Sequence, residues 1–517
     1  MNISCEEKSN KTEAFMHHKN IKVLVRKQLK KQYPQWKRLN HAAKREISKK
    51  VLAEVTAEYD FNQIISCSKA ELLGIEQQVS TKGLIKLDEM ARYIELFRTS
   101  NIFPLSRYQR SPLYIKDEEL RFIDELIDDR LINGILSTPG YSPAMRDLFP
   151  SALLRAELLK AIKYPEISYR KFCSEEYLGL DRKQNRVFCG LPLNRKEMID
   201  HTRLSKFRSG LSFVQQINLL VYFLHHFHQS GLLGDTILHA VDSTELASDF
   251  CRRPLATVKI NGKKIRIYND LDCDCGKRRN KRDKSEYVIG YRLHTLTAID
   301  ATTGHSYPLV SLLAPANHHD SHFLPFLVNL AQAMGVNLQL ITADEAYHDN
   351  DGSLFEKTGV RLTTPPSAKA KQPADIDAAT GAVFCDDLCA VAMQHLGVAD
   401  GNHEYRCGAE RCECDRAGVC PQYRFIPVDR GLFQRIPFHT NRLEEALAIR
   451  KNCERSFNLL KNQTGLETVR VRSQRATLAR CTLGSIAVLL IKMAGTRRQH
   501  SVRSPQQLSI WQEKKAA

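Results

Sequence analysis

Residues 236–245 read TILHAVDSTE, and residues 337–347 read NLQLITADEAY. Each stretch is a short apolar run of the kind that forms a buried β-strand. An aspartate follows each run directly, Asp242 in the first and Asp344 in the second. We expect both carboxylates to be held rigidly at the edge of a sheet. If the two strands are neighbours, the carboxylates lie close together and repel each other unless a cation sits between them.

A third acidic residue lies on a predicted helix near the C-terminus, in AIRKNCERSFNLLKNQTG (448–465). Arg450, Glu454 and Lys461 are spaced by offsets of 4 and 11 from the arginine. On an α-helix these offsets place the three side chains within roughly 40° of one another. Cys453 and Phe457 border the same face, so the sequence predicts charged groups on an otherwise buried stripe. Burying charge costs free energy unless the charge is paired or bound.

Asp242, Asp344 and Glu454 are the candidate catalytic residues and the candidate ligands of Mg²⁺ (or Mn²⁺). Three carboxylates on rigid elements can hold two such ions about 3.5–4 Å apart, which activates a water or a 3′-hydroxyl at a phosphate. Arg450 and Lys461 would then neutralise phosphate charge or contact the DNA backbone. Taken singly, these residues have structural alternatives. An aspartate after a strand commonly caps a turn, and Arg450 with Glu454 could form a surface ion pair.

Composition favours a polyanionic partner. Of 517 residues, 76 are Lys or Arg and 58 are Asp or Glu, which gives a net charge of +18. This excess favours double-stranded DNA, and a basic protein without such a partner is the alternative. The longest apolar stretches, 217–224 and 484–491, are shorter than the ~20 residues that span a bilayer. We therefore expect no membrane partner. The polar N-terminal segment and the fifteen cysteines predict a cytoplasmic protein with reduced thiols.

Residues 1–232 are predicted to form a mostly helical region that binds DNA ends. Within it, 26–50 contains ten Lys or Arg and one acid, with Tyr33 and Trp36 between them. Cations and flat rings suit a nucleic-acid surface, and the candidate contacts are Lys37 and Arg38. A solvated basic helix is the alternative. Apolar residues recur three and four positions apart, and so predict helices, over 117–136, 151–162 and 212–227.

From about residue 233 the pattern changes to strands, which predicts an α/β core in two parts, 233–366 and 439–496. Further strands are expected at KKIRIYND (263–270), YVIGYRLHTLTAID (287–300) and HSYPLVSLLAP (305–315). Asp320 or Ser321 is the expected N-cap of a helix that runs to about 334. The second part carries the Glu454 helix and a buried helix over 475–494. A cysteine-rich insertion (367–438) separates the two parts, and a basic flexible tail (497–517) follows them.

Two further segments carry candidate binding residues. Residues 273–282 are expected to form a basic loop beside Asp242, whose cations would contact DNA: Lys277, Arg278, Arg279, Lys281 and Arg282. An exposed loop without a partner is the alternative. The insertion contains a cluster of thiols that suits tetrahedral Zn²⁺: Cys407, Cys412, Cys414 and Cys420. Free thiols are the alternative, because the spacing is not that of a paired C-x2-C ribbon.

The order of these motifs resembles the DDE transposases of bacterial insertion sequences, over about 200–495. The segment DHTRLSKFR (200–208) is similar to one that precedes the core in that family. Four later segments of this chain resemble motifs of that family. They are Asp242-Ser243-Thr244, Tyr287-x2-Gly290-Tyr291-Arg292-x-His294, Ala343-Asp344-x2-Tyr347 and Arg450-x3-Glu454-x6-Lys461. One position departs from the family. Many members have a tyrosine three residues before the arginine, where this chain has Leu447.

The resemblance implies an RNase H-like mixed sheet flanked by helices, with Asp242, Asp344 and Glu454 as a metal-binding triad. It implies Mg²⁺-dependent cleavage at the terminal inverted repeats of an insertion sequence, followed by strand transfer to target DNA. The resemblance also implies that a homodimer assembled on DNA carries out these steps. It places the protein in the bacterial cytoplasm, associated with the nucleoid when it is bound to DNA. Two other functions stay open. One is a metal-dependent nuclease without strand transfer, and the other is a DNA-binding regulator with an inactive core.

Overall fold

The computed structural model describes most of the chain. The described residues are 22, 24–58, 83–99, 114–137, 148–194, 196, 199–232, 237–248, 253–260, 263–279, 285–301, 303–318, 320–347, 353–365, 382–385, 391–407, 422–427, 447–468 and 470–501. All structural statements below concern these residues. They cover most of both predicted parts of the core and several helices that precede it.

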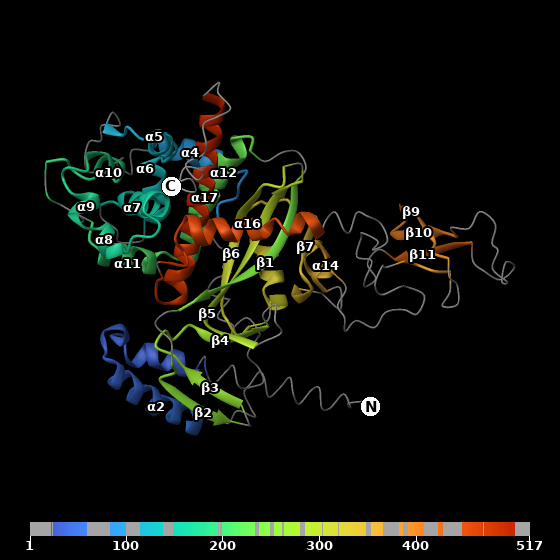
Figure 1. The fold of residues 1–517 in the computed structure, drawn as a ribbon, viewed down its shortest axis with the longest axis horizontal. Coiled ribbons are helices and arrows are strands. Elements are labelled where there is room, and N and C mark those ends of the chain that lie inside the picture. The colour runs from blue at the N-terminus through green and yellow to red at the C-terminus, as the bar shows by residue number, and fades with distance from the viewer. Residues whose placement is uncertain are drawn as a thin grey trace.

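A six-stranded mixed sheet forms the centre of the protein (Figure 1). Its strands are β1 (Ile237–Ala247), β4 (Asp274–Arg279), β5 (Ser285–Asp300), β6 (Ser306–Pro315), β7 (Leu340–Ala343) and β8 (Arg361–Thr363). Their order is β4-β5-β1-β7-β8, and β6 also pairs with β5. β1 runs antiparallel to β5 and parallel to β7, which is in turn parallel to β8. The predicted mixed sheet is confirmed.

The sheet is covered on both faces, and its sequence explains why. β6 is buried along its whole length. Strands that are covered on both faces are apolar almost throughout, instead of alternating between apolar and polar residues. Ala240 and Val241 are neighbours in β1 and point to opposite faces. Each lies in a hydrophobic cluster, which places one cluster on each side of the sheet.

Helices supply both covers. On one face, Ala240 and Ile299 form a cluster with Cys453 of α16 (Cys453–Asn458). The larger cluster joins the strands to α12 (Phe213–Gln229), α13 (Leu324–Ala333) and α17 (Gln474–Ser501). Figure 1 shows α16 lying across the sheet, with α12 and α17 beside it and α14 (Ser353–Thr358) near β7. The predicted flanking helices are therefore confirmed.

α17 contains the buried helix predicted over 475–494. Among the described residues, its segment Gln474–Gly495 is the one that is long and apolar enough to cross a membrane, and 89% of it is buried inside the protein. Leu483, Ile486 and Leu490 lie in the same hydrophobic cluster as the residues of α12. The segment therefore packs as a core helix. That the protein has no membrane partner stays a prediction.

The described residues between 83 and 210 contain eight helices. They are α4 (Met90–Thr99), α5 (Glu118–Leu126), α6 (Asp129–Leu136), α7 (Pro150–Lys163), α8 (Tyr169–Phe172), α9 (Glu175–Leu178), α10 (Lys183–Phe188) and α11 (His201–Gly210). Arg155 of α7 is 1% exposed and pairs with Asp124 of α5 and Asp129 of α6. Because a charge buried so deeply must be paired, these bonds join the three helices.

The basic N-terminal segment packs against a hairpin formed by β2 (Ala256–Ile260) and β3 (Lys263–Ile267). The segment includes a 3₁₀ turn, Trp36–Arg38, and α2 (His41–Glu58). Trp36 is 7% exposed, and its indole N–H donates to Asn269 O at 3.3 Å. The prediction that Trp36 offers its ring to nucleic acid is therefore wrong. The ring packs in a core that pairs the helix with a hairpin distant in sequence.

A separate three-stranded sheet lies within the predicted insertion. Its strands are β9 (Gln394–Ala399), β10 (Asn402–Arg406) and β11 (Tyr423–Pro427), with β10 in the middle. Figure 1 shows this sheet apart from the central one, on the side of β7 and α14. His403 of β10 is fully buried, and its Nδ1 lies 3.1 Å from Nε2 of His395.

Candidate functional site

The two aspartates predicted as a pair lie side by side. β1 and β7 are parallel neighbours, and their last paired residues are Val241 and Ala343. Asp242 and Asp344 come next on the two strands, so the register brings their carboxylates to the same level of the sheet. One detail of the prediction is wrong. β1 continues to Ala247, so Asp242 lies within the strand, where it pairs with β5, instead of after its end.

Both aspartates line an open cleft of about 420 Å³. The other residues that line it come from β1, β5, the turn after β6 and the segment 461–470 ahead of α17: Ser243, Thr244, Glu245, Ala247, Val288, Arg292, Asp320, Lys461, Glu467 and Arg470. Most of these side chains are charged, and both signs are present. Clefts for small organic ligands are mostly apolar, so this one better suits a charged, hydrated ligand.

The carboxylates in the cleft are held in an unfavourable environment for negative charge. Burial, together with the charges of Asp344 and Asp320, raises the pKa of Asp242 to about 6. The backbone N–H of Ser243 opposes this by donating to Asp242 Oδ1 at 2.7 Å. Burial also raises the pKa of Asp344, and the charge of Asp320 adds to the effect. Neighbouring carboxylates with raised pKa values are characteristic of sites that a cation stabilises.

Arg450 reaches the acidic pair, whereas Glu454 does not line the cleft. Arg450 Nη1 lies 3.5 Å from Asp242 Oδ2, and both side chains are 17% exposed. Glu454 lies in the first turn of α16, and its side chain is exposed. The prediction that Glu454 lies on a buried stripe is therefore wrong. A turn at 451–452 interrupts the helix, so the angles of a continuous α-helix do not hold across it.

Lys461 lines the cleft from a π-helical segment, Leu459–Gln463. The wider π turn departs from the 3.6-residue spacing assumed for a regular helix, and such segments are frequent at functional sites. Lys461 Nζ lies 2.7 Å from Glu467 Oε1, and the Glu467 side chain is 49% exposed. An ion pair this exposed is weak. The lysine can therefore exchange its partner for a phosphate at little cost.

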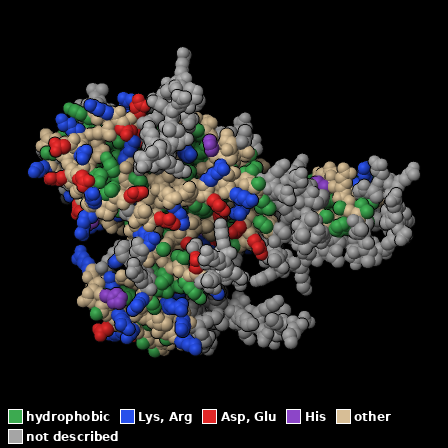
Figure 2. Space-filling view, viewed as in Figure 1, with side chains coloured by type: hydrophobic (Ala, Val, Ile, Leu, Met, Phe, Trp, Pro, Cys, Tyr) green, Lys and Arg blue, Asp and Glu red, His purple; other side chains and the backbone are tan. Residues whose placement is uncertain are grey.

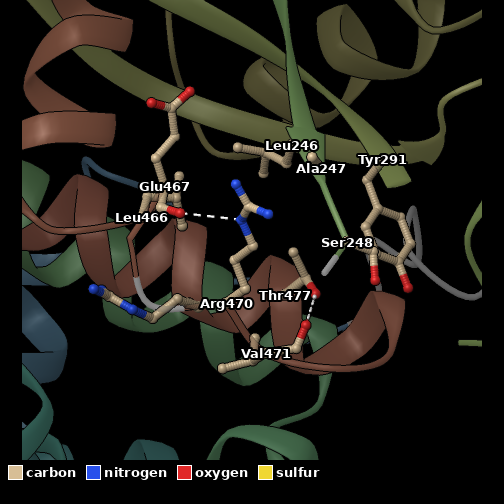
Figure 3. Close-up of a pocket in the computed structure, with 10 residues that line it drawn as sticks. Leu246, Ala247, Ser248, Tyr291, Leu466, Glu467, Arg470, Val471 and Thr477 are labelled. Carbon is tan, nitrogen blue, oxygen red and sulfur yellow. Dashed lines mark hydrogen bonds between the residues drawn. The ribbon is translucent and has the colours of Figure 1, made fainter. Parts of the chain in front are cut away.

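A smaller pocket adjoins the cleft (Figure 3). The two share Ala247, Glu467 and Arg470 among their lining residues. In Figure 3 the Arg470 side chain extends toward the end of β1, and its Nε donates to Glu467 O at 3.0 Å. Tyr291 closes the opposite side, with its hydroxyl donating to Asp270 Oδ2 at 2.7 Å. Arg470 thus supplies a second cation at this end of the cleft.

Asp320 and Arg292 are cleft residues whose roles the sequence did not reveal. The predicted N-cap role of Asp320 is wrong, because Asp320 begins a 3₁₀ turn, Asp320–His322, ahead of α13. Its Oδ1 accepts a hydrogen bond from Arg292 Nη1 at 2.7 Å, and its Oδ2 accepts one from Ser243 Oγ at 3.1 Å. Arg292 also donates to Glu245 Oε1 at 3.3 Å, across the β1–β5 ladder.

Gly290 and His294 of the strand motif have structural explanations. Gly290 lies where a Cβ would come within 2.1 Å of Leu246 O, so a side chain does not fit there. His294 is fully buried and stacks on Phe323 with ring centroids 4.4 Å apart. Burial lowers the pKa of His294 to about 4. Its Nδ1 lies 2.9 Å from the Tyr347 hydroxyl, which belongs to the second aspartate motif.

The predicted basic loop begins as a strand. Lys277, Arg278 and Arg279 lie in β4, which is antiparallel to β5, so the loop prediction is wrong for these three residues. β4 has one paired neighbour in the sheet, and the side chain of Lys277 is exposed. Lys281 and Arg282 lie outside the described residues. A cation on an exposed strand remains able to contact DNA.

The N-terminal cations divide into two groups. Lys22 and Arg26 pair with Asp274, and Lys30 pairs with Asp272 at 2.6 Å. These contacts attach the segment to the core. Other cations remain exposed, among them Arg38 at the end of the 3₁₀ turn that also contains Lys37. Figure 2 shows Lys and Arg side chains spread over the part of the surface where α2, β2 and β3 lie.

The cysteine cluster stays a prediction. Cys407 lies directly after β10 and donates its backbone N–H to Gln422 O at 3.0 Å. The other predicted zinc ligands, Cys412, Cys414 and Cys420, lie outside the described residues. Cys407 is a free cysteine, half-buried at the end of β10.

The cleft offers carboxylate oxygens to a divalent metal. Across the residues that the structure describes, no three His, Cys, Asp or Glu side chains are grouped closely enough to hold a metal ion. Asp242 and Asp344 nevertheless supply adjacent carboxylate oxygens, which are the donors that Mg²⁺ prefers. Their raised pKa values fit a position that a cation would stabilise. The pair fits a metal, and Glu454 as its third ligand stays a prediction.

Comparison with known proteins agrees with this geometry. Residues 240–490 match the family model described as a transposase DDE domain. No curated protein matches the chain. A cryo-EM structure of a piggyBac transposase synaptic complex with hairpin DNA is similar over 79% of this chain and 85% of that chain, at 12% identity and a TM-score of 0.22. We draw nothing further from a similarity at that score.

Proposed function

We propose that this chain, whose residues 240–490 match the family model of a transposase DDE domain, is the transposase of an insertion sequence. It would bind the terminal inverted repeats of the element, cut the DNA there and join the freed ends to target DNA. The observation that carries the proposal is the β1–β7 register, which brings Asp242 beside Asp344 in a charged cleft. The family match supports transposase function, and the finer steps are our inference.

Asp242 and Asp344 would hold the divalent metal, Mg²⁺ or Mn²⁺. When bound, the metal supplies an activated oxygen nucleophile and stabilises the charge of the leaving oxygen. Glu454 is the proposed third carboxylate of this site. Its exposed position at the start of α16 leaves it next to Cys453, which packs on the strand that carries Asp242.

The cations of the cleft would bind the DNA phosphates. Arg450, Lys461 and Arg470 lie at the cleft or contact its carboxylates. Arg450 now contacts Asp242, and Lys461 now pairs with Glu467. When a phosphate binds in the cleft, each cation would exchange its carboxylate partner for the phosphate. Such contacts position DNA and bind it without reading its sequence.

We infer that the exposed cations of the N-terminal segment and of β4 extend the DNA surface, with Arg38 and Lys277 as members. Transposition brings two element ends together, so a homodimer assembled on DNA is proposed as the active form. The cytoplasm, on the nucleoid when DNA is bound, is the proposed location. A structural Zn²⁺ at the cysteine cluster of the insertion is proposed separately, and metal analysis of protein purified without chelator tests it.

The experiment uses purified full-length protein, Mg²⁺ and a DNA fragment in which an antibiotic marker is flanked by the element's inverted repeats. Cleavage at the repeats and joined products in a target plasmid are the expected results. Asp242→Asn and Asp344→Asn should each remove both products while the protein still shifts repeat DNA in a gel. Activity that survives either substitution would refute the assignment of the site.

The same assay separates the competing functions. Cleavage at the repeats without any joined product, under conditions with target DNA in excess, would favour a nuclease. Binding to the repeats without cleavage in Mg²⁺ or Mn²⁺ would favour a DNA-binding regulator. Glu454→Gln is tested alongside, and its loss of cleavage with retained DNA binding is expected of a third metal ligand.

A further inference from the structure

A largely buried ion pair lies in the same cleft as the two aspartates. Asp320 is 5% exposed, and the Arg292 side chain is 18% exposed. Arg292 extends from β5, and Asp320 lies in the 3₁₀ turn after β6, so the pair joins two segments that flank β1. Both residues line the same cleft as Asp242 and Asp344. The inference below rests on the proposed function, because it concerns the metal site of that function.

The carboxylate of Asp320 has both oxygens engaged. Oδ1 accepts from Arg292 Nη1 at 2.7 Å, and Oδ2 accepts from Ser243 Oγ at 3.1 Å. Ser243 directly follows Asp242, and its backbone N–H donates to Asp242 Oδ1 at 2.7 Å. A continuous chain of hydrogen bonds therefore runs from Arg292 through Asp320 and Ser243 to Asp242.

This arrangement carries a cost that simple packing does not require. Among the described residues, Arg292 Nε is buried and makes no hydrogen bond. The carboxylate of Asp320 also adds a further negative charge to the cleft that Asp242 and Asp344 line. A fold that needed only to fill this space would be served as well by apolar side chains of similar volume. The charges thus favour a role in the site over a role in packing.

We propose that Asp320 is a positioning residue of the catalytic site, which orients Arg292 and Ser243 and thereby holds Asp242 in the geometry that binds the metal. Its Oδ1 accepts from Arg292 and its Oδ2 accepts from Ser243, so it reaches Asp242 through Ser243. Groups that orient a metal ligand in this way commonly change metal affinity or activity by about 10- to 100-fold when they are replaced.

The test measures Mn²⁺ binding to the full-length protein by calorimetry, without DNA, and cleavage of repeat DNA in parallel. Asp320→Asn should weaken Mn²⁺ binding by about 10- to 100-fold. Ser243→Ala, which keeps every charge and the Asp320–Arg292 pair, should weaken it as well. Since the two residues act in one chain, Asp320→Asn should cost less in the Ser243→Ala background than in the wild type.

Asp129→Asn is the matched control, because Asp129 is also a buried aspartate paired with an arginine but lies outside the core. It should leave Mn²⁺ binding unchanged. Wild-type affinity in both Asp320→Asn and Ser243→Ala would overturn the proposal, and so would effects that simply add. If the wild type itself binds no Mn²⁺ and cuts no repeat DNA, the proposed function fails with it. If the wild type binds Mn²⁺ and cuts repeat DNA, and the Asp320→Asn and Ser243→Ala variants do so equally well, the inference fails and the proposed function stands.

Discussion

Replacing Asp242 with asparagine should abolish cleavage and, in the metal-free protein, increase stability. The carboxylate is 17% exposed, and its pKa is raised from the ordinary 3.8 to about 6. At about 1.4 kcal/mol for each pKa unit, the ionised carboxylate destabilises the folded state by roughly 3 kcal/mol. Asparagine keeps an oxygen that can accept the Ser243 N–H and carries no charge. The attraction of Arg450, at 3.5 Å, already lowers this pKa, so the gain of roughly 3 kcal/mol includes the loss of that contact.

The gain depends on pH in a defined direction. Because the folded-state pKa of Asp242 lies above its unfolded value, the folded protein binds more protons between pH ~4 and ~6. Stability contributed by this group is therefore present below pH ~4 and is lost as the pH rises through about 6. Asparagine does not titrate. Its advantage should be about 3 kcal/mol at pH 8 and roughly half of that at pH 5.

Urea denaturation of the full-length protein in EDTA at pH 5 and pH 8 measures this effect. Asp181→Asn is the control, because that side chain is exposed outside the core, and it should change stability little. Adding Mg²⁺ should stabilise the wild type and leave the Asp242→Asn variant nearly unchanged, since a ligand stabilises only the state that binds it. The electrostatic reasoning would be refuted if the Asp242→Asn protein were less stable than the wild type at pH 8. It would also be refuted if the stability difference between the two proteins were the same at both pH values.

Three further outcomes are expected. Trp36→Ala should cost about 3–5 kcal/mol of the free energy that holds the N-terminal segment on the hairpin, which limited proteolysis of that segment would detect. Lys461→Ala should lower the affinity for DNA of any sequence and reduce the salt dependence of binding by about one counterion, as measured by titration at several salt concentrations. Arg155→Ala should destabilise the helical region by about 3–5 kcal/mol in thermal unfolding, because Asp124 and Asp129 would stay buried without their partner.

The sequence predicted those features that depend on neighbouring residues along the chain. The apolar runs before Asp242 and Asp344 form β1 and β7, and the helical periodicities form α7, α12 and α17. Burial of one face or both leaves a pattern of period 2 or 3.6, or a continuous apolar run, that can be read locally. The order of the acidic motifs also indicated a site between two adjacent strands.

Two predictions failed where the outcome depended on residues far apart in sequence, and a third failed because a helix is locally irregular. Trp36 was expected at a DNA surface, and the hairpin that buries it begins more than 200 positions later. Asp320 was expected to cap a helix, but its carboxylate instead accepts a hydrogen bond from Arg292 of β5. Glu454 was expected on a buried helix face because the prediction assumed one regular α-helix. The helix is instead broken at 451–452, and a π segment follows Glu454.

The sequence by itself determined the element types, the apolar core stripes and the two aspartates, because each is set by side-chain chemistry and local spacing. Only the tertiary structure decided which of them meet. The pairing of Val241 with Ala343 brings the two aspartates together, and the turn after β6 brings Asp320 into the same cleft. The physical reason is that a charge buried in the cleft is stabilised or destabilised by whatever lies within a few ångströms, and packing of distant segments chooses those neighbours.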